Sequence, residues 1–308
     1  MILNKTKKAE LTNEQIVILI ILIVSFAVLL FFLYKLNLGK TTSKEVCHNS
    51  VMLKSSTISK LKETVSLNCD RSYICITEDS DGCKEMYKPE IVEVKNLDEI
   101  YQKLADEMAN CWWMFGEGRV DYIGEDFFIK DNYCSVCSQI LFDTSLNNIK
   151  GIDEEKISKD NLYDYMSKTK LPGKEITYLE YIFGTTEISQ LKQLASQQSN
   201  LEGTFGDIEV GKQYFNVMGI TSEVGIGWKI AGGVVIVIGL GTGFLFPGLI
   251  VGVVIIGGGE VAKGKQPEIG AIIVEGKGIP NKFMAPTILE ADSDKFKALN
   301  CEDIITFT

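Results

Sequence analysis

The chain has 308 residues, with 41 acidic against 31 basic side chains and a formal net charge of −10 at pH 7. A chain this acidic, whose only arginines are Arg71 and Arg119, offers no basic surface for nucleic acid, so we expect no nucleic-acid partner. Its one histidine, His48, excludes mechanisms that need two imidazoles and most histidine-rich metal sites, and we predict no metal, no cofactor and no catalytic residue.

The first predicted element is a membrane-spanning helix over residues 15–36. The run from Gln15 to Tyr34 holds no charged residue. As a helix it would cover about 30 Å, the thickness of the hydrocarbon core of a bilayer. Lysines in residues 1–14 favour a cytoplasmic N-terminus, and no small-x-small cleavage site follows the run. We therefore predict an uncleaved signal anchor in the cell membrane that places the next region outside the cytoplasm; a cleaved signal peptide is the alternative.

Residues 37–223 are predicted to form a cysteine-rich extracytoplasmic domain. An even number of cysteines on the oxidising side of a membrane is typical of a disulfide framework. A turn between Cys75 and Cys83 suits a local bridge, which leaves Cys47 and Cys69 free to pair. The candidates for disulfides are Cys47, Cys69, Cys75, Cys83, Cys111, Cys134, Cys137 and Cys301.

Residues 97–115 form the clearest predicted helix of this domain. Apolar side chains recur there at steps of three and four residues, Asn96 can cap the start, and Gly116 ends the pattern. Cys111 lies on the apolar stripe that faces the core. Trp113 cannot share that face fully with its neighbour, so we favour a place at the rim of the core and keep it as a candidate for contact with a partner or with the lipid interface.

Cys134 and Cys137 form a C-x-x-C motif between strand-like segments near residues 122–129 and 138–143. A redox pair needs a low-pKa thiolate, usually at a helix N-terminus, and a four-cysteine zinc site needs a second C-x-x-C motif. Because the sequence shows neither, we favour structural disulfides to separate elements, with Cys111 as the natural partner of one cysteine. A redox pair and half of a zinc site are the alternatives.

The rest of the domain is expected to hold short elements. We predict a helix near residues 162–167, two short helices around Gly184, and a hairpin of strands 207–210 and 213–220. Helices and strands do not alternate in regular βαβ units, so the sequence predicts an α+β fold.

A second apolar run, residues 230–259, is uncharged and rich in glycine. We predict that residues 224–262 form a transmembrane hairpin of two short helices; a single span is the alternative. Small-xxx-small spacing would allow close helix packing within the hairpin or between copies of the chain. The glycines with this spacing are Gly239, Gly243, Gly248 and Gly252.

A hairpin would return the C-terminal segment, residues 263–308, to the extracytoplasmic domain. Cys301 would then join the other cysteines on the oxidising side, whereas a single span leaves an odd number there. Lys263 and Lys265, just after the apolar run, favour the single span. Short strands that would need a sheet to join are expected near residues 271–274, 287–289 and 304–307.

These patterns predict a membrane-anchored, disulfide-stabilised binding or structural protein of the cell envelope, acting in adhesion, assembly or surface recognition, and not an enzyme. Its expected partners are the lipid bilayer and either another protein or a second copy of the chain, bound through the glycine-rich segment. Two other functions stay open: a membrane-tethered thiol–disulfide oxidoreductase that uses Cys134 and Cys137, and a membrane-perturbing or pore-forming protein that uses residues 230–259.

Overall fold

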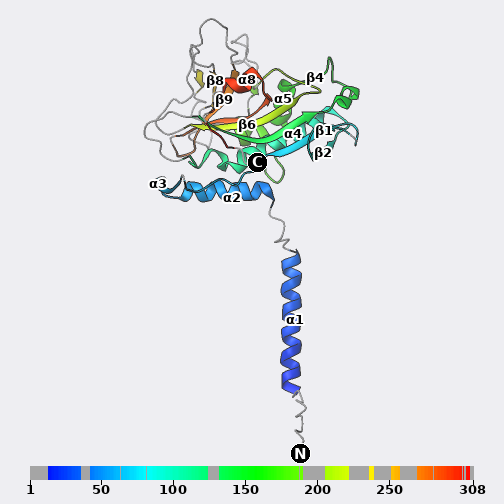
Figure 1. Ribbon diagram of the computed structural model, residues 1–308, viewed down its shortest axis with the longest axis vertical. Coiled ribbons are helices and arrows are strands. Elements are labelled where there is room, and N and C mark those ends of the chain that lie inside the picture. The colour runs from blue at the N-terminus through cyan, green and yellow to red at the C-terminus, as the bar shows by residue number, and fades with distance from the viewer. Residues whose placement is uncertain are drawn as a thin grey trace, which may run out of the picture. The chain divides into compact units, whose positions relative to one another are not determined.

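The computed structural model describes most of the chain (Figure 1). The described residues are 13–35, 42–62, 64–80, 82–123, 132–186, 188–189, 205–221, 236–238, 251–256, 269–279, 281–299, 301 and 303–305. The chain divides into two compact units, Met1–Thr42 and Ser43–Thr308.

The first unit contains helix α1 (Asn13–Lys35). Its large apolar side chains between Ile16 and Val28 are exposed by 42% to 65%, so they do not pack into a core. Within the described part of the chain, no helix combines the length and the apolar character needed to cross a bilayer. The helix itself is present as predicted, and its use as a signal anchor stays a prediction.

The second unit is built on one mixed sheet (Figure 1). Nine strands of the described residues join it in the order β2-β1-β3-β6-β10-β9-β8-β7, with β11 also beside β3. Strand β1 is parallel to β2 and β3, and β11 is parallel to β3. The other neighbours are antiparallel. The strands are β1 (Ser72–Thr77), β2 (Glu90–Glu93), β3 (Asn132–Phe142), β6 (Gln213–Thr221), β7 (Ile236–Ile238), β8 (Val251–Ile256), β9 (Ile269–Glu275), β10 (Lys282–Glu290) and β11 (Asp303–Ile305).

Strand β3 is central because both of its edges are paired along most of its length. Strand β6 pairs with one edge between Asn132 and Leu141. The other edge is shared: β11 pairs with residues 133–135 and β1 with residues 138–142. Chain segments from both ends of the second unit therefore meet on one strand.

Helix α4 (Leu97–Met114) provides the main apolar face packed on this sheet. As predicted, the Asn96 side chain accepts the backbone N–H of Glu99, and Gly116 follows the helix with a left-handed φ of 80°. Its buried stripe, which includes Leu104 and Met108, packs with α5 (Lys159–Lys168), α6 (Tyr178–Phe183) and one face of the sheet in a single apolar cluster.

The opposite face of the sheet carries a smaller core. The end of α8 (Asp294–Ala298) brings Phe296 and Leu299 against Phe215 and Val217 of β6 and Cys134 of β3. The sheet is therefore covered on both faces where β3 and β6 meet. The remaining elements are α2 (Ser43–Ser56), α3 (Ser59–Lys62), η1 (Gly116–Gly118), η2 (Thr144–Asn148), β4 (Lys156–Ser158) and β5 (Asp207–Glu209).

These elements make the predicted α+β class correct, but one predicted pairing is wrong. Strands β5 and β6 occupy the segments expected to form a hairpin, yet they do not pair with each other: β5 pairs with β4, and β6 pairs with β3 and β10. The turn at Gly211 therefore connects strands of two different sheets. Each of the two strands pairs with a partner that is more distant in the sequence. Most of the strand expected at residues 122–129 lies outside the described residues.

The glycine-rich run also differs from the prediction where it is described. Residues 236–238 and 251–256 are strands β7 and β8, paired antiparallel with each other, and β8 pairs with β9. They are not membrane helices. Valine and isoleucine dominate both segments, and β-branched side chains favour strands. Of the four glycines expected to pack helices, Gly252 lies on β8 opposite Ile273, and Gly239, Gly243 and Gly248 lie outside the described residues.

The C-terminal segment forms strands where short strands were expected. Strands β9 and β10 extend the sheet beyond β6, and β11 pairs with β3. These C-terminal strands thus join the same sheet that contains β3.

Candidate functional site

All eight predicted disulfide candidates are bonded, and no cysteine is free. The framework links helix to sheet, strand to loop, and the C-terminal segment to the central strand. The predicted Cys75–Cys83 and Cys47–Cys69 bridges are both present, and Cys111 bonds one member of the C-x-x-C motif as expected. The four bonds are Cys47–Cys69, Cys75–Cys83, Cys111–Cys137 and Cys134–Cys301.

The C-x-x-C motif lies on strand β3, and this explains its two partners. Successive side chains of a strand point to opposite faces, so Cys134 and Cys137, three residues apart, face opposite sides of the sheet. Cys137 belongs to the apolar cluster with α4, whereas Cys134 belongs to the cluster with α8. Three strand residues span about 10 Å, too far for the two cysteines to bond each other. No described feature of the motif favours the redox alternative.

Trp113 is only partly exposed, because the neighbouring helix covers one side of it. The His48 ring of α2 stacks on Trp113 with centroids 4.1 Å apart. His48 Nδ1 lies 2.8 Å from the Trp113 carbonyl oxygen, which can only accept, so Nδ1 carries the proton. Lys44 of the same helix reaches the buried Glu107 of α4 at 3.0 Å. These contacts clamp α2 to α4; a contact of Trp113 with a partner stays a prediction.

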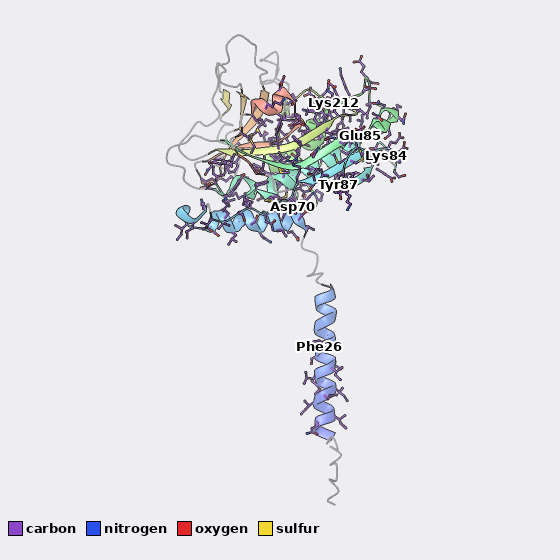
Figure 2. All side chains as sticks on the ribbon, viewed as in Figure 1. Phe26, Asp70, Lys84, Glu85, Tyr87 and Lys212 are labelled. Carbon is purple, nitrogen blue, oxygen red and sulfur yellow. A yellow bond between two sulfur atoms is a disulfide. The ribbon has the colours of Figure 1, made fainter. Side chains whose placement is uncertain are left out.

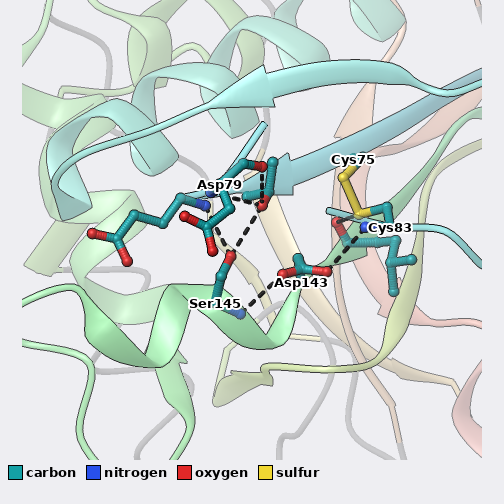
Figure 3. Close-up of a disulfide and its surroundings, with 8 residues drawn as sticks. Cys75, Asp79, Cys83, Asp143 and Ser145 are labelled. Atoms are coloured by element: carbon teal, nitrogen blue, oxygen red, sulfur yellow. Dashed lines mark hydrogen bonds between the residues drawn. A yellow bond between two sulfur atoms is a disulfide. The ribbon is translucent and has the colours of Figure 1, made fainter. Parts of the chain in front are cut away.

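A pocket of about 310 Å³ lies where β1 and β3 end side by side. Because the two strands are parallel, the loops that follow them leave the sheet at the same edge. The pocket is lined by Asp79, Gly82, Cys83, Lys84, Glu85, Leu141, Phe142, Asp143, Thr144 and Gly211. The Cys75–Cys83 bond holds the loop after β1 against the sheet beside it (Figure 3).

Asp143 joins the two loops at this pocket (Figure 3). Its carboxylate accepts the backbone N–H of Cys83 at 3.0 Å and of Ser145 at 2.9 Å. Partial burial acts to raise the pKa of Asp143. The N–H bonds from Cys83 and Ser145, with help from the Ser145 hydroxyl, outweigh burial and lower this pKa below its usual value. Asp143 is thus ionised, and its carboxylate holds the two loops together.

The hydroxyls of Thr77 and Ser145 also form hydrogen bonds that hold the two loops in place. Ser145 Oγ accepts the backbone N–H of Glu78 at 3.0 Å and lies 3.0 Å from the Thr77 hydroxyl. The Thr77 hydroxyl donates to the Asp79 carbonyl oxygen at 2.8 Å. No histidine lines the pocket, so Ser145 has no imidazole base beside it. Such a pocket can bind a ligand through rigid loops, but its arrangement does not match acyl-transfer chemistry.

Exposed aromatic and charged side chains extend from the same loop. Tyr87 is 81% exposed, with the Lys88 ammonium 5.2 Å from its ring centroid. Tyr73 of β1 and Ile91 of β2 are also exposed. Figure 2 marks Tyr87 together with Lys84 and Glu85, which line the pocket. We use the name aromatic rim for three exposed side chains, the tyrosines Tyr73 of β1 and Tyr87 of the following loop together with the aliphatic Ile91 of β2.

Sequence reasoning missed this pocket. The sequence predicts a turn between Cys75 and Cys83 but gives neither Asp79 nor Asp143 a role. Two aspartates, each just after a strand, were the available signal; parallel pairing of the strands was not visible. No group of three or more acidic, histidine or cysteine side chains that could hold a metal ion occurs within the part that the structure describes.

Comparisons with protein families, with curated proteins and with solved structures find no match for the chain.

Proposed function

We propose that the protein is a disulfide-stabilised binding protein of the cell envelope, held at a membrane by its N-terminal segment and without enzymatic activity. The observation that carries this proposal is the pairing of all eight cysteines in four disulfides. Such a set is stable in an oxidising compartment and is rare in a reducing cytosol.

Anchorage rests on the uncharged run from Gln15 to Tyr34 and on the exposure of its described apolar side chains in α1. Exposed apolar side chains on a helix need a covering, and lipid is the covering that the length of the uncharged run suits. In this proposal the second unit lies outside the cytoplasm.

The aromatic rim is the proposed contact surface for a protein partner. Tyrosine side chains contribute large contact areas at small cost in conformational entropy, and they are enriched at protein interfaces. The Cys75–Cys83 bond and Asp143 hold the adjoining loop in place, so less ordering is needed on binding.

Protease protection of a C-terminally tagged chain tests the sidedness. Protease added to intact spheroplasts should digest the second unit, whereas a cytoplasmic control protein stays whole. A variant that lacks residues 1–36 and carries a cleavable export signal should be recovered from the soluble extracytoplasmic fraction. A second unit that resists protease until the membrane is lysed would contradict the proposal.

A further inference from the structure

Three cationic side chains from three distant segments gather beside the turn that follows α4. Arg119 Nη1 lies 3.5 Å from Glu117 Oε2, and Lys174 Nζ lies 3.7 Å from Glu117 Oε1. The backbone N–H of Lys277 donates to the Gly118 carbonyl oxygen at 2.7 Å, which places the β9–β10 loop against the same turn.

The turn itself has an unusual backbone. Gly116, Glu117 and Gly118 have φ values of 80°, 57° and 70°, so three successive residues are left-handed. The left-handed conformation at a residue with a side chain costs about 1 kcal/mol or more, and such strain gathers at functional sites. The surrounding structure holds Glu117 in this position.

Tyr181 of α6 helps to hold the carboxylate. Its hydroxyl donates to Glu117 Oε1 at 2.5 Å, and the Lys174 ammonium lies 4.1 Å from the centroid of its ring. The Glu117 side chain is 17% exposed, whereas the Arg119 and Lys174 side chains are 60% and 45% exposed. One fixed carboxylate thus lies beneath cations that solvent can reach.

The cluster has more positive charge than its carboxylate can balance. Arg119, Lys174 and Lys277 against Glu117 leave a local charge of +2, in a chain whose net charge is −10. Among the described residues the Lys277 ammonium has no ion pair or hydrogen bond. Burial and the nearby charge of Arg119 lower the pKa of Lys277, the Glu117 carboxylate acts to raise it, and Lys174 lowers it again, so the pKa lies below its usual value.

We propose that Arg119, Lys174 and Lys277 bind a phosphate group as a dianion. A dianion would neutralise the excess charge, give Lys277 a partner, and accept the planar guanidinium of Arg119 through two oxygens. The group can come from free phosphate or from a phosphomonoester headgroup of a lipid. This site is separate from the pocket and the aromatic rim, so its failure would leave the proposed function intact.

Calorimetric titration of the full-length chain, purified in detergent without reductant, tests the site. Inorganic phosphate is titrated at fixed ionic strength, with chloride as the competing monovalent anion. We expect saturable binding that weakens by about tenfold or more in Lys277→Gln and in Arg119→Gln, since each removes a charge-assisted contact. Lys168→Gln, which removes an exposed lysine of α5 outside the cluster, should bind phosphate as the unchanged chain does.

Glu117→Gln should change the affinity for phosphate in the opposite direction. The amide keeps an acceptor for Tyr181 but removes the competing negative charge, so phosphate should bind more tightly. A water-soluble short-chain phosphatidate in place of phosphate distinguishes the source: tighter binding than phosphate identifies a lipid headgroup, and weaker binding identifies free phosphate. Absence of saturable phosphate binding, or equal affinity in the Lys277→Gln and Lys168→Gln variants, would overturn the proposal.

Discussion

At the scale of single residues, Asp143 shows how one carboxylate can connect two loops. It accepts backbone N–H groups from Cys83, after β1, and from Ser145, after β3. A buried or half-buried N–H that loses its acceptor destabilises the folded state by about 1–3 kcal/mol. The position of the pocket loop therefore depends on a side chain that lies outside that loop.

Asp143→Asn should lower the free energy of unfolding by roughly 1–2 kcal/mol at pH 7, because the amide offers one oxygen in place of two. The pKa of Asp143 is lower when folded than its usual value of 3.8. Its carboxylate therefore stabilises the fold above pH 3.8, and this contribution is lost as the pH falls through the folded pKa. Urea unfolding between pH 7 and pH 3 should show a shallower acid loss in Asp143→Asn. Asp70→Asn, at an exposed position, is the control; identical acid profiles for Asp143→Asn and the unchanged chain would contradict this role.

Gly118 and Gly278 form a matched pair that separates two effects of a Cβ atom. Both are left-handed, with φ of 70° and 81°, but a Cβ on Gly118 would lie 2.9 Å from the Trp112 ring, whereas nothing lies within 4 Å of a Cβ on Gly278. Gly278→Ala should cost about 1 kcal/mol from the backbone alone, and Gly118→Ala should cost more. Urea midpoints of the two variants measure the difference, and equal midpoints would show that Trp112 gives way freely.

At the scale of elements, strand β3 connects the two halves of the disulfide framework. Cys137 bonds α4 on one face, and Cys134 bonds Cys301 on the other. In both cases the bond adds a covalent link to an apolar contact that already exists. The spacing of the motif, read as a strand, is what sends the two bonds in opposite directions.

Loop size predicts the order in which these disulfides matter. Cys134–Cys301 closes a loop with a sequence separation of 167, and Cys75–Cys83 one of 8. The chain-entropy relation gives about 5 kcal/mol for the first and about 2.5 kcal/mol for the second. Urea unfolding of Cys134→Ala/Cys301→Ala and Cys75→Ala/Cys83→Ala double variants should follow this order, and the reverse order would contradict it.

Helix α4 could be predicted from the sequence because its signals are local: an apolar stripe of period 3.6, the Asn96 cap and the glycine at its end. The glycine-rich run could not. An uncharged Val- and Ile-rich segment fits the pattern of a membrane span and that of a buried strand equally well. Hydropathy indicates that a segment prefers an apolar environment, but it does not distinguish lipid from protein as that environment. The pocket could not be predicted either, since Asp79 and Asp143 meet only through the parallel pairing of β1 and β3.

At the scale of the whole molecule, the proposed place of the second unit outside the cytoplasm rests on two features. Its cysteines are all paired, and the chain is strongly acidic, which favours solubility and discourages binding to anionic surfaces. The proposed phosphate site is a positively charged cluster in this acidic chain. Anions would therefore be attracted to that cluster and repelled by the rest of the surface.

The structure pairs every cysteine in one particular pattern, and chemical mapping of the disulfides tests that pattern directly. Thiols are blocked with N-ethylmaleimide in intact cells before lysis, and the purified chain is digested without reductant for mass spectrometry. We predict no maleimide-modified cysteine and four cross-linked peptides, joining Cys47 to Cys69, Cys75 to Cys83, Cys111 to Cys137 and Cys134 to Cys301. Maleimide on most cysteines, or a Cys134–Cys137 bond, would contradict the account.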